Sequence, residues 1–212
     1  MATGTPLEVA VLVGLQASGK SAFYRQRLSG DHELVSKDLF PRGARRKQDR
    51  QMRLVAEALE AGRSVAVDNT NPSPEEWGPL IEAGHAHGAK VTAYWFPPDL
   101  AGSLARNAAR QGRDRVPDTG IHATVRRLRR PSRADGFDAV REVRFDDRGG
   151  FEVRPAADRR GAPPGSGADE HEPRTGPNSD EGELWISLNS DEGEPPRTDP
   201  SPDEPPHGST PV

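Results

Sequence analysis

The sequence predicts an α/β fold in which helices cover both faces of a mainly parallel sheet. Short apolar runs rich in β-branched residues alternate with segments of helical periodicity, which is typical of strand–helix–strand units. The runs at 7–13 and 64–68 are apolar almost throughout, as expected for parallel strands buried on both faces. Such folds bind ligands beyond the carboxyl ends of their strands, so we expect a site in the loops 14–21, 36–42 and 68–73.

The strands are predicted from apolar, β-branched and aromatic composition. Residues 32–36 are the weakest candidate. The turn sequence 146–150 contains two aspartates and two glycines and favours a closing hairpin between the last two strands. In order, the predicted strands are 7–13, 32–36, 64–68, 90–96, 141–145 and 151–155.

The helices are predicted from apolar spacing and from their start and stop residues. Ser73 is placed as an N-cap, with Pro74 at the first helical position and two acidic residues in the first turn. Gly62 ends an earlier amphipathic segment. In order, the predicted helices are 20–29, 45–62, 73–88, 99–110 and 120–130.

Composition divides the chain into a domain at 1–155 and a tail at 156–212. The tail holds 13 acidic and 4 basic residues and 11 of the 21 prolines. The tail therefore carries a charge of −9, and because the whole chain carries −4, the domain carries +5. The tail has too few apolar residues for their burial to offset the entropy lost on ordering the chain. We therefore expect a disordered, acidic, proline-rich tail. Its apolar cluster at 184–188, between two copies of NSDEGE, is a candidate contact for a protein partner or for the domain itself.

Several classes of protein are excluded by composition. The chain has no cysteine, which rules out disulfides and thiolate metal sites. The apolar run at 7–15 is short and lacks a basic flank in front of it, so we expect neither a signal peptide nor a membrane segment. A cytoplasmic location is the expectation.

A phosphate-binding loop is predicted at 14–21. Gly14, Gly19, Lys20 and Ser21 satisfy the pattern G-x-x-x-x-G-K-[ST], directly after a predicted strand and at the start of a predicted helix. The backbone N–H groups of such a loop surround phosphates, the lysine reaches the β and γ phosphates, and the serine hydroxyl binds Mg²⁺. We therefore expect ATP and Mg²⁺ as ligands. The loop residues assigned to ATP are Gly14, Gln16, Ala17, Ser18, Gly19, Lys20 and Ser21, with Ser21 as the metal ligand.

Three further segments extend this pattern: VSKDLF, VAVDNTNPSPEEW and RNAARQGRDRVPD. Together with the loop, they resemble the kinase domain of polynucleotide 5′-kinases and of polynucleotide kinase/phosphatases, within the wider AAA-type group of P-loop ATP-binding kinases. The resemblance covers nearly all of residues 8–146. It implies a P-loop kinase fold that transfers the γ-phosphate of ATP to the 5′-hydroxyl of DNA or RNA.

The resemblance assigns catalytic roles to two residues besides Lys20. Asp38 takes the place of the general base that accepts the proton of the 5′-hydroxyl. Arg110, together with Arg106 on the ATP side, takes the place of the lid arginines that neutralise charge in the transition state. The alternatives are an N-cap role for Asp38 and a solvated helix face for the two arginines.

The acceptor side is assigned to Arg42, Asp68 and Asn71. Asp68 ends a predicted strand, where a carboxylate lies near either the hydration shell of Mg²⁺ or the acceptor. Asn71 precedes a proline, so an Asx-turn that only joins strand to helix is an equal alternative.

The sequence departs from the family on this side. Pro41 stands where some members have an arginine for the acceptor phosphate, and Ser36 and Lys37 stand where an Asn-Arg pair is usual. Two other functions therefore stay open, a kinase for a small metabolite and an ATP-dependent binding module. The basic run at 125–133 is either a track for a phosphate backbone or a solvated helix face.

Overall fold

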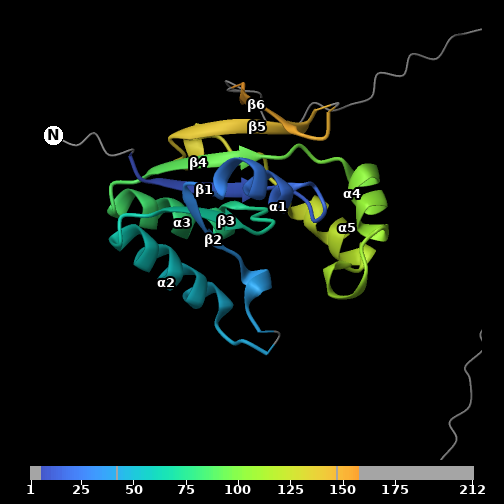
Figure 1. The fold of residues 1–212 in the computed structure, drawn as a ribbon, viewed down its shortest axis with the longest axis horizontal. Coiled ribbons are helices and arrows are strands. Elements are labelled where there is room, and N and C mark those ends of the chain that lie inside the picture. Colours follow the sequence, from blue (N-terminus) through green and yellow to red (C-terminus); the bar gives the residue numbers. More distant parts are fainter. Residues whose placement is uncertain (1–5, 42, 147, 158–212) are drawn as a thin grey trace, which may run out of the picture. The chain divides into compact units, whose positions relative to one another are not determined.

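The predicted sheet is present in the computed structural model, which describes residues 6–41, 43–146 and 148–157. Within these residues, six strands form one sheet in the order β2-β3-β1-β4-β5-β6 (Figure 1). All neighbouring pairs are parallel except β5 and β6, which form the predicted antiparallel hairpin. The strands are β1 Glu8–Val13, β2 His32–Val35, β3 Ser64–Asp68, β4 Lys90–Trp95, β5 Ala139–Phe145 and β6 Phe151–Pro155.

Helices cover both faces of the sheet, as the sequence predicted. Alternate residues of β1 face opposite sides: Val9 and Val11 lie in a cluster with α2 and α3, whereas Leu12 packs with Phe23 of α1. The helices α4 and α5 pack on each other near the carboxyl ends of the strands (Figure 1). The helices are α1 Lys20–Phe23, α2 Lys47–Glu60, α3 Pro74–Ala86, α4 Leu100–Ala108 and α5 Asp118–Arg127.

Two helix predictions differ from the structure, one in helix type and one in extent. The helix predicted at 20–29 is α-helical only to Phe23 and continues as a π-helical turn, Tyr24–Leu28, closed by a bond from the Ser29 N–H to the Tyr24 carbonyl. The helix predicted at 120–130 ends at Arg127, because the Arg129 N–H leaves the helix and donates to the Pro72 carbonyl.

Some predictions fall outside the described residues. Arg42 and the tail from residue 158 onward belong to this group, so the tail prediction stays a prediction. Of the helices that the structure does describe, none has the length and apolar character needed to cross a bilayer.

Gly84 allows α3 to lie close to the sheet. A Cβ atom at this position would lie 2.5 Å from Cγ2 of Val91 and 3.2 Å from Cγ2 of Val9. We expect Gly84→Ala to lower the free energy of unfolding by about 1–3 kcal/mol, because neither valine can move without disturbing the core. Urea denaturation measures the change.

The control is Gly30→Ala, in an exposed turn where a Cβ atom meets nothing within 4 Å. It is expected to be neutral or to stabilise the fold by about 0.4–1 kcal/mol. Equal effects of the two substitutions would show that α3 does not need this close approach.

Candidate active site

Three loops meet at the carboxyl edge of the sheet, where the sequence placed the site. They follow β1, β2 and β3, which are neighbours in the sheet. The Gly14 N–H donates to the Thr70 carbonyl at 3.1 Å, and the Ser36 hydroxyl donates to the Asp68 carbonyl at 2.7 Å. The three loops are thus held together by hydrogen bonds between their own polar groups.

The loop after β1 contains several backbone N–H groups without a protein partner among the described residues. Ala17 and Gly19 are left-handed, with φ of 56° and 97°. In the described part of the chain, the N–H groups of Gln16, Ala17 and Gly19 donate to no protein acceptor. The N–H groups that open α1 have no partner within the helix either. Unpaired N–H groups in a loop that leads into a helix N-terminus fit the phosphate oxygens of a nucleotide.

Both glycines of the loop are required by close neighbours. A Cβ atom at Gly14 would lie 2.8 Å from Cβ of Phe96, and one at Gly19 would lie 2.6 Å from Cζ of Phe145. At Gly19 the positive φ adds to the restriction. The loop conformation therefore depends on the two glycines of the sequence pattern.

Lys20 is buried beneath this loop. Its Nζ donates to the carbonyls of Gly14, at 3.1 Å, and Leu15, at 2.5 Å. Burial lowers the pKa of Lys20 to about 8, although the nearby carboxylate of Asp68 raises it. An anion in the loop would favour the charged form, which suits Lys20 to a phosphate ligand.

Ser21 and Asp68 form the best candidate for a Mg²⁺ site. The Ser21 hydroxyl donates to Oδ2 of Asp68 at 2.5 Å. Burial raises the pKa of Asp68, while the bond from Ser21 and the charge of Lys20 lower it. A hydroxyl and a carboxylate are hard oxygen donors of the kind that Mg²⁺ takes beside substrate phosphates, so these residues fit the ion. The sequence allowed two positions for Asp68, near the hydration shell of Mg²⁺ or near the acceptor. The bond to Ser21 favours the first, on the phosphate side.

Asp38 stands free at the end of β2. It lies on a single 3₁₀ turn, Lys37–Leu39, and its side chain is exposed. The N-cap of this turn is Ser36, whose hydroxyl accepts from the Asp38 N–H at 3.3 Å. Within the described residues, the Asp38 carboxylate makes no hydrogen bond, so the alternative of an N-cap aspartate does not hold.

The charge of Asp38 acts on two residues at the phosphate loop. Burial is the main influence on the pKa values of Lys20 and Asp68, but the negative charge of Asp38 raises both. A carboxylate within electrostatic range of the loop, and unpaired, is available to a second substrate.

Asn71 needs a correction, because its side chain does not face an acceptor. It is 1% exposed, and its Nδ2 donates to the carbonyls of Leu12, at 2.8 Å, and Val67, at 3.3 Å. Asn71 therefore joins the ends of β1 and β3 and positions the loop between them.

The two predicted lid arginines have different surroundings. Nε of Arg106 donates to the Ala17 carbonyl at 2.7 Å, and its Cζ lies 5.0 Å from the centre of the Phe145 ring. Arg106 therefore belongs to the wall of the phosphate loop and not to a solvated helix face. Arg110 is exposed and donates to the Asp114 carbonyl at 3.3 Å, and its charge helps burial to lower the pKa of Lys20.

Phe145 is a site residue that the sequence reasoning missed. It ends β5, is 48% exposed, and lies between Gly19 and the Arg106 guanidinium. The sequence held only a partial signal, an aromatic residue at the carboxyl end of a predicted strand, whereas its exposure and its approach to Gly19 come from the structure.

Comparison with known proteins identifies the family of the chain. The family model described as an AAA domain matches residues 9–131. A bifunctional polynucleotide phosphatase/kinase of Schizosaccharomyces pombe is 25% identical over 142 residues, which are 65% of this chain and 34% of that protein. The chain thus spans about a third of the length of this curated relative.

Solved structures share the fold. A fungal RNA kinase superposes with a TM-score of 0.51 and 18% identity, over 66% of this chain and 39% of its own. Kti12 of Chaetomium thermophilum, in complex with ADP-AlF3, superposes with a TM-score of 0.53 and 16% identity, over 66% and 90% of the two chains. The predicted P-loop kinase fold and the resemblance to polynucleotide kinases are confirmed, and the chain belongs to the AAA domain family.

Proposed function

We propose that this protein is an ATP- and Mg²⁺-dependent kinase that transfers the γ-phosphate of ATP to the 5′-hydroxyl of a polynucleotide. The observation that carries the proposal is the unpaired Asp38 carboxylate on a loop joined to the phosphate side. Ser36 ties this loop to Asp68, and Asp68 bonds to Ser21 of the phosphate loop. A free carboxylate beside a phosphate cradle is what transfer to a hydroxyl requires.

Each residue has a defined task in this reaction. The N–H groups of the loop and Lys20 bind the phosphates of ATP. Ser21 and Asp68 hold Mg²⁺, which neutralises phosphate charge when it is bound. Asp38 accepts the proton of the attacking hydroxyl, and Arg110 stabilises negative charge at the transferred group.

The test uses the full chain with γ-labelled ATP, Mg²⁺ and DNA or RNA oligonucleotides. Label is expected on strands with a 5′-hydroxyl and not on the same strands with a 5′-phosphate, because the phosphate occupies the acceptor position. Comparing DNA with RNA identifies the preferred acceptor. Binding of ATP without labelling of either nucleic acid would overturn the proposal.

The same experiment separates two rival functions. A kinase for a small metabolite would share the phosphate loop and Asp38, and Pro41 in place of the family's arginine favours it. Turnover with a hydroxylated metabolite and none with oligonucleotides would identify that rival. Slow ATP turnover with every acceptor would indicate a binding module that ATP controls.

Phe145 is proposed to stack on the adenine of ATP, together with Arg106. We expect Phe145→Ala to weaken ATP binding about tenfold, because stacking of a base on an aromatic ring contributes about 1–3 kcal/mol. Calorimetry with ATP and with inorganic tripolyphosphate measures the effect. Only ATP affinity should fall, and an equal loss for tripolyphosphate would mean that Phe145 supports the loop and not the base.

A further inference from the structure

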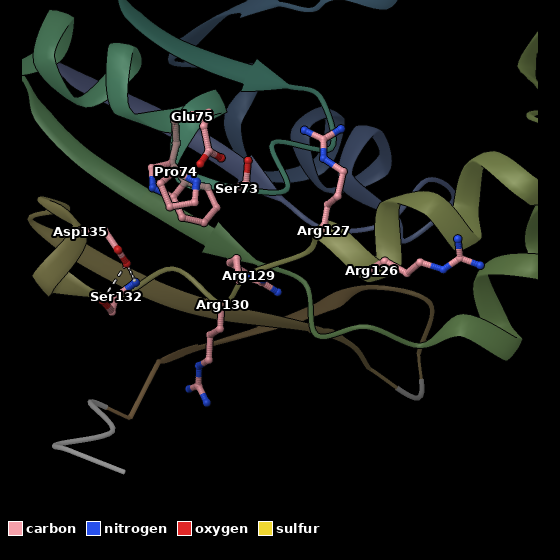
Figure 2. A pocket seen from close by; sticks show the side chains of 10 residues that line it. Ser73, Pro74, Glu75, Arg126, Arg127, Arg129, Arg130, Ser132 and Asp135 are labelled. Carbon is pink, nitrogen blue, oxygen red and sulfur yellow. Dashed lines mark hydrogen bonds between the residues drawn. The ribbon is translucent and has the colours of Figure 1, made fainter. Parts of the chain in front are cut away.

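A pocket of about 530 Å³ lies between the start of α3 and the segment that follows α5. Figure 2 shows Ser73 and Glu75 on the helix side and a run of arginines on the other. We call these arginines the basic strip. Its members are Arg126, Arg127, Arg129 and Arg130.

A buried hydroxyl that lines this pocket makes no hydrogen bond of normal geometry to the residues that the structure describes. Ser73 is 7% exposed, and its Oγ makes no hydrogen bond within the described residues. It is the N-cap residue of α3 but forms no capping bond. Ser73 nevertheless lies close enough to Glu75 to be the main influence that lowers the pKa of that carboxyl. A buried hydroxyl without a partner costs free energy, so a ligand that reaches it gains a bond.

The charges of the pocket favour an anion. Glu76 binds Arg127 at 3.1 Å, and Glu142 lies 3.8 Å from Arg130. Arg126 and Arg129 form no ion pair with any residue that the structure describes. Two carboxylates also line the pocket, but the four arginines outnumber them. Asp135 already accepts from the N–H and the hydroxyl of Ser132, and Glu75 lies beside Ser73 within range of the charges of Arg127 and Arg129.

The arginines are spread out and do not converge on one point. In Figure 2, Arg127 and Arg130 point in opposite directions from the segment that carries them, and Arg126 points away along its helix. A single small anion could contact only one or two of them. Guanidinium groups spaced along a surface fit a ligand with several phosphates in a row.

The basic strip is connected to the proposed acceptor site. Oε1 of Glu76 binds Arg127, and its Oε2 lies 3.4 Å from Nζ of Lys37, the residue before Asp38. The Arg129 N–H donates at 2.7 Å to the carbonyl of Pro72, four residues after Asp68. Two bonded paths thus lead from the strip to the loops that carry Asp38 and Asp68.

We infer that the basic strip and the Ser73 hydroxyl bind backbone phosphates of the acceptor strand, beyond the nucleotide whose 5′-hydroxyl reacts. This inference rests on the proposed polynucleotide kinase function and extends it to the path of the strand. It explains how an acceptor is held although Pro41 stands where the family has an arginine.

The test compares a dinucleotide with a longer single strand, both with a 5′-hydroxyl, as acceptors for the full chain. For wild type, the longer strand is expected to have the lower KM. Charge reversal in Arg126→Glu/Arg129→Glu should raise this KM at least about tenfold and leave the KM values of the dinucleotide and ATP unchanged. Loss of two phosphate contacts should also reduce the slope of log affinity against log salt by about 1.4.

Ser73→Ala separates binding from folding. Because the hydroxyl has no protein partner, its removal should leave the melting temperature unchanged or higher, while the KM of the longer strand rises. The control Arg53→Glu/Arg63→Glu makes the same charge change on exposed side chains away from the pocket, and should leave that KM near the wild-type value.

Two results would overturn the inference, and they differ from each other. Labelling of oligonucleotides with a KM that is independent of length, or that the strip variants leave unchanged, would reject the strip but keep the kinase. No labelling of any polynucleotide by wild type would reject the proposed function and the strip with it.

Discussion

Asp38→Asn is expected to slow phosphoryl transfer by about 10²–10⁴-fold, the usual contribution of a positioned general base. The substitution keeps the size of the side chain but removes its ability to take a proton. Its ATP affinity should stay within about twofold of wild type, because Asp38 makes no hydrogen bond to the phosphate loop in the described structure. Single-turnover labelling of an oligonucleotide measures the rate, and calorimetry measures ATP binding.

The matched control is Asp31→Asn, at the opposite end of β2. Asp31 is exposed and lies in the turn before this strand. Its substitution should leave the transfer rate unchanged. If Asp38→Asn retained the wild-type rate, the proton would have to leave by another route, and the role given to Asp38 would be wrong.

The fold was predictable because its patterns are local. The strands of a parallel sheet with helices on both faces are apolar on both sides, and this marks β1 and β3 in the sequence without any tertiary information. The phosphate loop was predictable for a related reason. Its glycines, lysine and serine follow one another, so one short pattern contains the whole cradle.

Residues whose surroundings come from distant parts of the chain were harder to predict. Asn71 looks like a polar rim residue in sequence, but the carbonyls that it meets belong to β1 and β3. Phe145 reaches Gly19 only because β5 pairs with β4, which pairs with β1. Neither the direction of a side chain nor the order of strands can be read from neighbouring residues alone.

Lys20→Met is expected to reduce phosphoryl transfer by at least about 10²–10³-fold, the usual effect of losing one donor to developing charge. Unlike Asp38, Lys20 lies inside the phosphate loop and bonds to its carbonyls, so the substitution should weaken ATP binding as well. Thermal melting with and without ATP measures this. At an ATP concentration 100-fold above Kd, ATP should stabilise the wild-type protein by about 2.7 kcal/mol. Lys20→Met should lose most of this stabilisation.

The control is Lys90→Met, since Lys90 is exposed at the start of β4, away from the loop edge. It should keep both activity and the stabilisation by ATP. Together, the variants separate the candidate functions, because Asp38→Asn removes transfer alone and Lys20→Met removes transfer and ATP binding. A binding module controlled by ATP would lose its function in Lys20→Met but keep it in Asp38→Asn. A kinase would lose its function in both variants. If wild type labelled no acceptor, and only Lys20→Met lost an ATP-dependent property while Asp38→Asn kept them all, the protein would use ATP without transferring its phosphate.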